Sequence, residues 1–420
     1  MRLLRSLAEF VFIRHRSLTV AVALFVISLV MAFSNGFWLM ARLANVILVA
    51  IPLAYVWSRL NLRGLEVTVE RPVDRLQEGN HFDARITVRN RSWYTKLWLE
   101  VEDPSDLPGR ATKRIVSVAP RSMRTWRAAT LCTRRGLYTV GPVRVTTGDP
   151  FGFFRTTRSF GSTQHVLVYP RAVELPNFYV PPAHLPGEGR FRRPTQNLTP
   201  NAFGARVYEP GDSFSRIHWP STARTNELMV KLFELDPASD IWVILDLQRD
   251  VQAGEGDDGT EEHGVRVAAA VARFFLLANR SVGFLAFGRQ LHAQEAERGI
   301  SQYTRILEEL ALARAEGDVP LAELVNHEAR RFGRHTTVVA VTPSTDEGWV
   351  VSLQALAGRG VKLAAVLLEP RTFGGEGDEA LLVYSALAAA DIYTYLVKRS
   401  DDLLTVLSPD AETVVTGGGA

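Results

Sequence analysis

Seven residues suited to chemistry or recognition fall within nineteen positions of the chain. They are Arg206, Tyr208, Gly211, Asp212, Arg216, Trp219 and Arg224. Guanidinium groups form bidentate pairs with carboxylates, so the arginines and Asp212 would suit a salt-bridged clasp between two domains. Alternatively, the arginines face outward and bind carboxylates of a partner, because Arg, Tyr and Trp dominate interface hot spots. The clasp is the favoured interpretation, and the docking surface stays open beside it.

A catalytic role for this stretch has little support. His218 lies beside Trp219 but has no paired nucleophile in the sequence around it, and a lone histidine more often serves packing. Trp219 is expected to be buried. The chain contains no G-x-x-x-x-G-K-[ST], H-E-x-x-H or G-x-S-x-G segment. The sequence therefore predicts no catalytic residue and a protein that is not an enzyme.

Composition restricts the protein class further. The chain has 420 residues, is 46% hydrophobic and 22% charged, and can form about two to three domains with real cores. Its formal net charge of +3 is too small to indicate nucleic acid as a partner. The single cysteine, Cys132, excludes an internal disulfide framework and a C-x-x-C metal site.

Strands and helices are predicted to alternate after the seven-residue cluster, over residues 237–410. Predicted strands cover Ile241–Leu245, Val282–Ala286, Thr336–Val341, Val361–Leu368 and Ile392–Val397. Helices are expected at Val265–Leu277, Ile306–Ala313, Val350–Ala357, Leu381–Ala389 and Asp401–Leu407. This alternation predicts an α/β domain with a mostly parallel sheet and helices on both faces. Residues 411–420 are expected to be a disordered tail.

A different pattern is found over residues 64–168, which precede the predicted α/β domain. Short runs such as Leu65–Val69, Ala84–Val88 and Leu97–Val101 alternate apolar and polar residues, with turn residues between them. Such runs predict an antiparallel β-sandwich. The aromatic residues of the stretch 148–154 are expected to pack in a core or between domains. Residues 171–236 are read as a proline-rich linker followed by the seven-residue cluster.

The N-terminal residues, 1–60, are predicted to be a membrane anchor. Residues 18–33 carry no charge, and residues 37–57 carry only Arg42. A bilayer span takes about 20 apolar residues, so these stretches indicate two transmembrane helices. Four arginines precede the hairpin, Arg59 and Arg63 follow it, and the turn has none. The positive-inside rule then places both ends, and the soluble domains, in the cytoplasm at the plasma membrane as a multi-pass protein.

The whole arrangement resembles a bacterial family known as domain of unknown function 58. The resemblance rests on Arg206-x-Tyr208-x-x-Gly211-Asp212, then Arg216-x-x-Trp219 and Ala223-Arg224, with further matches at Arg135–Pro142 and Asp149–Gly152. It implies that residues 237–410 form a von Willebrand factor A-like, Rossmann-like domain. It also implies partnership with a MoxR-type AAA+ ATPase.

The same resemblance directs attention to a metal site. In A-like domains the first strand ends in D-x-S-x-S, whose oxygens bind Mg²⁺; here the segment is Asp246–Asp250, with Gln248 and Asp250 in place of the serines. Ser301 is the candidate for the hydroxyl of a second loop. Hard cations need several converging oxygen ligands. A degenerate site that caps the strand is therefore favoured over Mg²⁺ binding by Asp246, Gln248, Asp250 and Ser301.

Three functions follow as expectations. The preferred one is a non-enzymatic membrane-anchored adaptor that binds a protein partner, a MoxR-type ATPase, in envelope-related or complex-assembly work. The second is a metal-dependent hydrolase acting at Asp246. The third is a purely structural scaffold that oligomerises. The sequence does not predict the oligomeric state.

Overall fold

The computed structural model describes residues 16–109, 112–180, 202–207, 219–225, 227–233, 240–375 and 380–408. The chain divides into two compact units, Met1–Tyr169 and Pro170–Ala420, each with its own contacts. The predicted tail, residues 411–420, lies outside the described residues.

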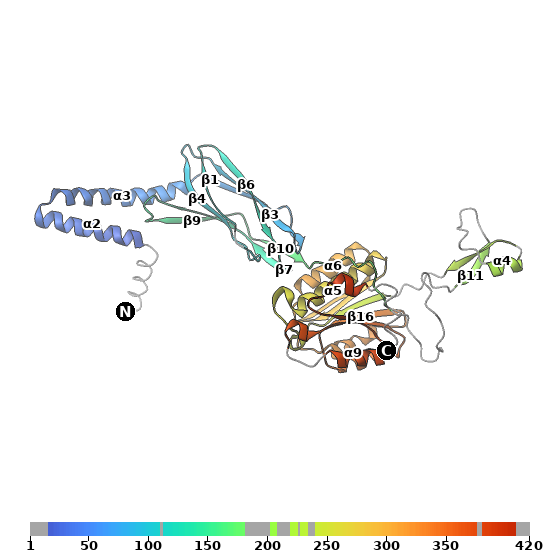
Figure 1. The fold of residues 1–420 in the computed structure, drawn as a ribbon. Helices are drawn as coiled ribbons and strands as arrows, with labels where there is room; N and C mark the ends of the chain where they lie inside the picture. Colours follow the sequence, from blue (N-terminus) through green and yellow to red (C-terminus); the bar gives the residue numbers. More distant parts are fainter. Residues whose placement is uncertain are drawn as a thin grey trace. The chain divides into compact units, whose positions relative to one another are not determined.

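Two long apolar helices are the first elements that the structure describes in the first unit (Figure 1). Helix α2 covers Arg16–Asn35 and helix α3 covers Trp38–Leu62, so both extend beyond the predicted spans. Ser17–Ser34 and Trp38–Leu62 have mean hydropathies of 2.4 and 1.9, and each window is only 11% buried. Outward-facing apolar side chains along an entire helix are the pattern that lipid, not water, favours. Both helices are therefore candidate membrane spans.

Ten strands follow the helices in the part of the first unit that the structure describes. They are β1 (Leu65–Glu70), β2 (Arg75–Gln77), β3 (His81–Asn90), β4 (Lys96–Asp103), β5 (Thr112–Val118), β6 (Met123–Leu131), β7 (Gly136–Val140), β8 (Val143–Gly148), β9 (Arg155–Phe160) and β10 (Gln164–Tyr169). They form three sheets with orders β1-β3-β6, β2-β10-β7 and β5-β4-β8-β9. All pairs are antiparallel except β10 with β2, which is parallel. The alternating sequence runs thus predicted the strands and their dominant direction.

The end of α3 is built into these strands. The Lys96 side chain is fully buried, and its ammonium donates hydrogen bonds to the carbonyls of Leu60 (2.6 Å) and Arg63 (2.7 Å) and to the hydroxyl of Tyr94 (2.9 Å). A cation there satisfies the last carbonyls of the helix and complements its dipole. Burial lowers the pKa of Lys96, against the opposing effect of Tyr94. Asn61 adds a hydrogen bond to the Leu97 carbonyl (2.7 Å).

The second unit contains a six-stranded sheet. Its strands are β13 (Asp240–Leu245), β14 (Val282–Phe287), β15 (Leu291–Glu297), β16 (Thr336–Thr342), β17 (Lys362–Leu368) and β18 (Tyr393–Val397). The order across the sheet is β15-β14-β13-β16-β17-β18, and every pair is parallel except β14 with β15. This order is that of a doubly wound sheet. The mostly parallel sheet was predicted, whereas the antiparallel edge strand β15 was not.

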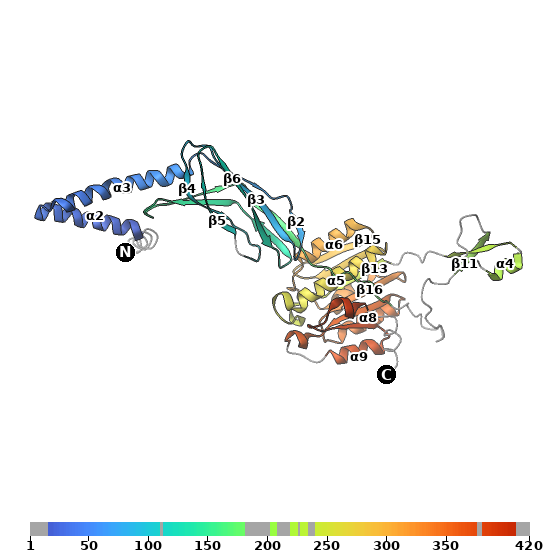
Figure 2. The same ribbon diagram turned by 45° about the horizontal axis from the view of Figure 1, so that its top comes forward.

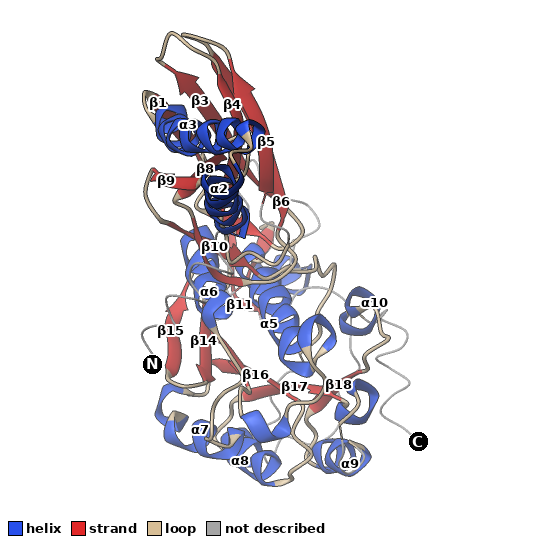
Figure 3. Ribbon diagram, turned by 90° about the vertical axis from the view of Figure 1, so that its left-hand side faces the viewer, coloured by secondary structure: helices blue, strands red, loops and turns tan. Residues whose placement is uncertain are grey.

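Helices cover both faces of this sheet (Figure 3). They are α5 (Thr260–Leu277), α6 (Ile300–Leu312), α7 (Leu321–His327), α8 (Gly348–Ala357), α9 (Leu381–Ala389) and α10 (Leu403–Leu407). Trp242 and Ile244 of β13 face the core formed with α7, α8 and α9. Leu245 points to the other face, which α5 covers. There Gly264 of α5 lies so close that a Cβ added to it would be 3.1 Å from the Leu245 side chain. The sequence-predicted α/β layers are therefore present.

Residues 170–180 differ from the predicted linker, because they pack against the α/β layers. Phe178 is 5% exposed and stacks on Tyr395 of β18, with ring centroids 4.8 Å apart. The Tyr395 hydroxyl donates to the Tyr179 carbonyl (2.9 Å) and accepts from the Tyr179 amide (2.8 Å). Burial of an aromatic ring among other aromatic rings stabilises the packed position of the segment. This segment is thus part of the α/β fold.

Candidate functional site

Asp246 stands at the centre of the carboxyl edge of the parallel sheet. It follows β13 directly, beside β16, and the chain leaves these two strands toward opposite faces, to α5 and to α8. Doubly wound sheets bind ligands at such a point. The Asp246 residue is only 4% exposed. The structure thus places the first predicted ligand where the fold would put a site.

Hydrogen bonds engage both carboxylate oxygens of Asp246. The Thr342 hydroxyl donates to Oδ2 (2.6 Å), and the Gln248 backbone amide donates to Oδ1 (3.0 Å). The Thr342 hydroxyl in turn accepts from the Ser344 amide (2.9 Å). Burial raises the pKa of Asp246 to about 6, and the two donors only partly offset this. The carboxyl group therefore ties the loop after β13 to the loop after β16.

The remaining predicted ligands of this loop are arranged differently. Gln248 is half-buried, and its backbone forms an isolated parallel bridge with Gly317. Asp250 lies in the short 3-10 helix η2 (Arg249–Val251) and is exposed. The Arg249 amide donates to the Gly317 carbonyl (2.8 Å), and its guanidinium approaches the Glu316 carbonyl (3.5 Å). The loop is thus held by backbone contacts with residues 316–317.

Ser301 is not brought to Asp246. Strand β15 is antiparallel, and its last residue, Glu297, pairs with Val282, the first residue of β14. The chain therefore enters α6 at the amino edge of the parallel strands, opposite the edge that holds Asp246. Gln302, the residue after Ser301, confirms this location, because its side chain donates to the Val282 carbonyl (2.8 Å). The prediction for Ser301 is therefore wrong, because the antiparallel strand β15, which was not predicted, brings the chain back to the amino edge before α6.

A different loop reaches the Asp246 edge, namely residues 313–320 after α6. Gly317 donates its amide to the Leu247 carbonyl (3.0 Å). A Cβ on Gly317 would lie 2.5 Å from the Phe287 carbonyl oxygen, so the approach requires glycine. Asp318, next to it, is exposed. The sequence signal for this loop was a glycine between two acidic residues directly after a helix.

The donor set fits Mg²⁺ poorly. Within the described part of the chain, no group of three or more His, Cys, Asp and Glu side chains is placed to hold a metal ion. Both Asp246 oxygens already accept hydrogen bonds, and Mg²⁺ demands a near-octahedral oxygen shell. The observed contacts suit a cap that fixes the edge loops, and we derive no chemistry through a metal.

Only part of the seven-residue cluster can be described. The Arg206 backbone lies in β11 (Ala202–Val207), which pairs antiparallel with β12 (Met229–Phe233), opposite Val230. The structure does not describe residues 208–218, which include four cluster residues and His218; those residues are Tyr208, Gly211, Asp212 and Arg216. The clasp with Asp212 therefore stays a prediction.

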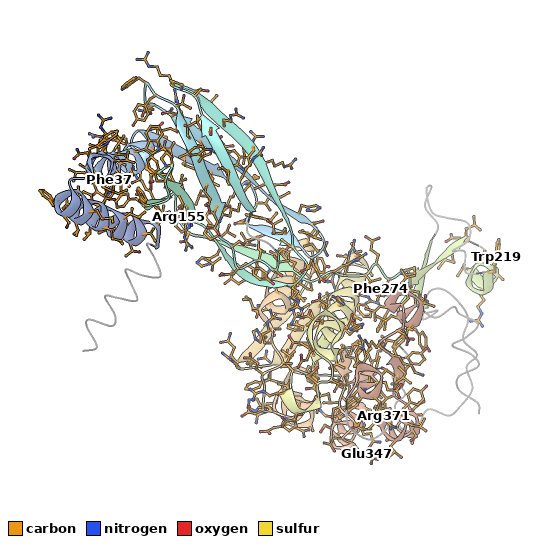
Figure 4. All side chains as sticks on the ribbon, turned by 60° about the vertical axis from the view of Figure 1, so that its left-hand side comes forward. Phe37, Arg155, Trp219, Phe274, Glu347 and Arg371 are labelled. Carbon is orange, nitrogen blue, oxygen red and sulfur yellow. The ribbon has the colours of Figure 1, made fainter. Side chains whose placement is uncertain are left out.

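The short helix α4 (Trp219–Thr225) carries the rest of the motif. Trp219 is 65% exposed, so the prediction of a buried tryptophan is wrong (Figure 4). Ala223 and Arg224 are exposed as well. The helix is joined to β12 through the Thr222 hydroxyl, which accepts from the Met229 amide (3.0 Å).

Comparisons with known proteins agree with the predicted resemblance over part of the chain. Residues 204–373 match the family described as "Protein of unknown function DUF58". The uncharacterized protein YeaD of Bacillus subtilis is 24% identical over 307 residues, covering 71% of this chain and 75% of that protein. An uncharacterized protein of Mycobacterium tuberculosis is 30% identical over 179 residues, covering 40% of this chain and 54% of its own length.

Similarity to solved structures is weaker. A CARDB domain from Pyrococcus furiosus covers 25% of this chain and 94% of its own, at 17% identity and a TM-score of 0.19. So low a score carries no argument about fold or function.

Proposed function

We propose that the chain is a non-enzymatic, membrane-anchored adaptor. In this proposal α2 and α3 anchor it in the plasma membrane, the strands of the first unit form a β-sandwich, and both units face the cytoplasm. The α/β unit acts as a von Willebrand factor A-like domain that binds a protein partner, a MoxR-type AAA+ ATPase. The family resemblance supports the identity of the partner, and the arginines flanking the helices support the orientation.

The internally hydrogen-bonded carboxylate of Asp246 is the observation that carries the proposal. Its bonds to Thr342 and Gln248 are internal, so they fix two loops instead of presenting a reactive group. A surface whose loops are already ordered loses less conformational entropy when a partner binds. The structure of this edge therefore favours recognition of another protein.

Charge indicates what the partner's surface should look like. Asp250, Asp318, Asp346 and Glu347 are exposed in the loops at this edge (Figure 4 shows Glu347). Three arginines are exposed there as well, Arg249, Arg289 and Arg314, and the last two are paired with Glu316 and Glu261. Complementary charge steers association and selects partners. A partner with a basic docking face follows from this arrangement.

Recovery of the ATPase from membranes in mild detergent tests the proposal. The double variant Asp318→Asn with Glu347→Gln removes two charges from exposed side chains. Asp391→Asn removes one charge at the other edge, before β18, and asparagine tolerates its positive φ of 58°. We expect the double variant to recover several-fold less ATPase than the wild type and the Asp391 control. Equal recovery from all three, or none from the wild type with and without ATP and Mg²⁺, would reject the proposal.

A further inference from the structure

The connection between β8 and β9, residues 149–154, is a loop with three phenylalanines that we call the aromatic loop. Asp149 organises it: its carboxylate accepts hydrogen bonds from the amides of Phe151 (2.8 Å) and Phe154 (2.5 Å). Gly152 supplies a φ of +72° and donates its amide to the Asp149 carbonyl (3.1 Å). The loop is therefore a defined structure, not a loose connection.

This loop lies against the two candidate membrane helices. The Ser17 hydroxyl, at the start of α2, donates to the Gly152 carbonyl. Phe154 packs edge-on against Tyr55 of α3, with centroids 5.5 Å apart and an interplanar angle of 78°. The hydroxyl of Thr156, just after the loop, approaches that of Ser58 on α3 (3.4 Å). Contacts with both helices fix the height of the loop along the hairpin.

The position of Tyr55 along α3 gives that height. A helix rises about 1.5 Å per residue, so Tyr55 lies about 26 Å along the axis from Trp38, the first residue of α3. A hydrocarbon core is about 30 Å thick. If one side of the hydrocarbon core lies at Trp38, the other side therefore lies near the level of Tyr55. The aromatic loop, which packs on Tyr55, lies at that level too.

The exposed side of the loop is apolar, and Phe151 departs from the expectation that these aromatic residues pack in a core or between domains. Phe151 is 57% exposed and stacks on Phe153, with centroids 5.5 Å apart and planes 19° apart. Two arginines lie near this apolar side. The Arg59 guanidinium lies 5.4 Å from the centre of the Tyr55 ring. The Arg155 side chain is 76% exposed beside the helices (Figure 4), with its guanidinium 3.7 Å from the Glu100 carboxylate. Aromatic rings next to arginines are the composition of the interfacial layer of a bilayer.

We propose that the aromatic loop inserts Phe151 and Phe153 into the headgroup layer of the bilayer leaflet that the strands face. The loop then acts as a third membrane contact beside α2 and α3. This inference rests on the membrane anchor of the proposed function and adds a lipid-binding site outside the helices. The arginines suit anionic headgroups.

Site-specific fluorescent labels in the full-length chain test it. The chain is reconstituted in vesicles of phosphatidylcholine and phosphatidylglycerol, and an environment-sensitive maleimide is attached to single cysteines. Phe151→Cys reports the loop. Leu137→Cys is the matched control, because Leu137 is 56% exposed and lies in β7, at the end of the unit remote from α2 and α3 (Figures 1 and 2). Native Cys132 is fully buried and serves as the unlabelled blank.

The label at position 151 should be quenched by lipids with a nitroxide near the headgroup, and its iodide quenching constant should be several-fold smaller than that at position 137. Val49→Cys, in the middle of α3 and 65% exposed, reports the anchor itself. If iodide quenches positions 151 and 137 equally while deep nitroxide lipids quench position 49, the loop inference is wrong and the anchor stands. If iodide also quenches position 49, the anchor fails and the inference fails with it.

Discussion

Asp246 should make the α/β unit less stable as the pH rises. Burial raises its pKa from 3.8 to about 6, so the folded state binds the proton more tightly than the unfolded chain does. The stabilisation from this group is fully present below about pH 4 and is lost as the pH rises through about 6. At 1.36 kcal/mol per pKa unit, the full loss is about 3 kcal/mol.

The variant Asp246→Asn isolates this effect, because asparagine keeps the shape of the side chain and cannot ionise. Urea unfolding of both full-length proteins in mild detergent, followed by tryptophan fluorescence, gives the two free energies of unfolding at each pH. Trp242 and Trp349, both buried in this unit, supply the signal. The free energy of the variant minus that of the wild type should rise by about 2–3 kcal/mol between about pH 4 and about pH 7.5.

A pH-independent difference would refute the reasoning, and so would a difference of the opposite sign. A pH-independent difference would mean that folding leaves the pKa of Asp246 unchanged, and the opposite sign would mean that the folded state favours the ionised carboxylate. Added Mg²⁺ gives a second criterion, since a ligand that binds the folded state stabilises it. If Mg²⁺ raises the stability of the wild type at about pH 7.5 but not that of Asp246→Asn, the strand-end cap is a metal site after all.

Three further perturbations test other contacts. Thr342→Val removes the hydroxyl that lowers the pKa of Asp246, so the midpoint of the pH dependence should move above 6 in the same urea titration. Phe178→Ala removes the ring stacked on Tyr395 and should cost the α/β unit about 3–5 kcal/mol of unfolding free energy, whereas a free linker would show no change. Lys96→Met removes the charged donor from the Leu60 and Arg63 carbonyls, which keep only the neutral donors of Tyr94, Arg63 and Ser92, and should cost about 1–3 kcal/mol in thermal unfolding of the first unit; an unchanged transition would contradict the capping role.

The parallel strands were predictable because they are buried on both faces. Such strands read as continuous apolar runs, and the predicted Thr336–Val341 differs from β16 by one residue. The two apolar helices were equally clear in the sequence. By contrast, β15 reads Leu-His-Ala-Gln-Glu-Ala-Glu, whose polar edge-strand composition hides it. Because this strand was not predicted, Ser301 was expected at the carboxyl edge of the sheet, whereas it lies at the amino edge.

Isolated aromatic residues were the other source of error. Phe178 stands in a proline-rich stretch without periodicity, so no pattern indicated that it enters the core of the α/β unit. Phe151 and Trp219 looked like core residues by type, yet both are exposed. Burial of a single side chain depends on what other segments place against it, and local sequence does not contain that information. Asp246 was found because the family resemblance directed attention to the end of the first strand, and the apolar run Ile241–Leu245 located that end.

Quantitative recovery of the MoxR-type ATPase with the full-length chain from detergent-solubilised membranes tests the adaptor most directly. The account predicts that wild type and Asp391→Asn recover the ATPase to the same extent, and that Asp318→Asn with Glu347→Gln recovers several-fold less while remaining folded and membrane-bound. Recovery that does not change when these charges at the Asp246 edge are removed would contradict it, as would a wild-type chain that forms stable oligomers and retains no ATPase.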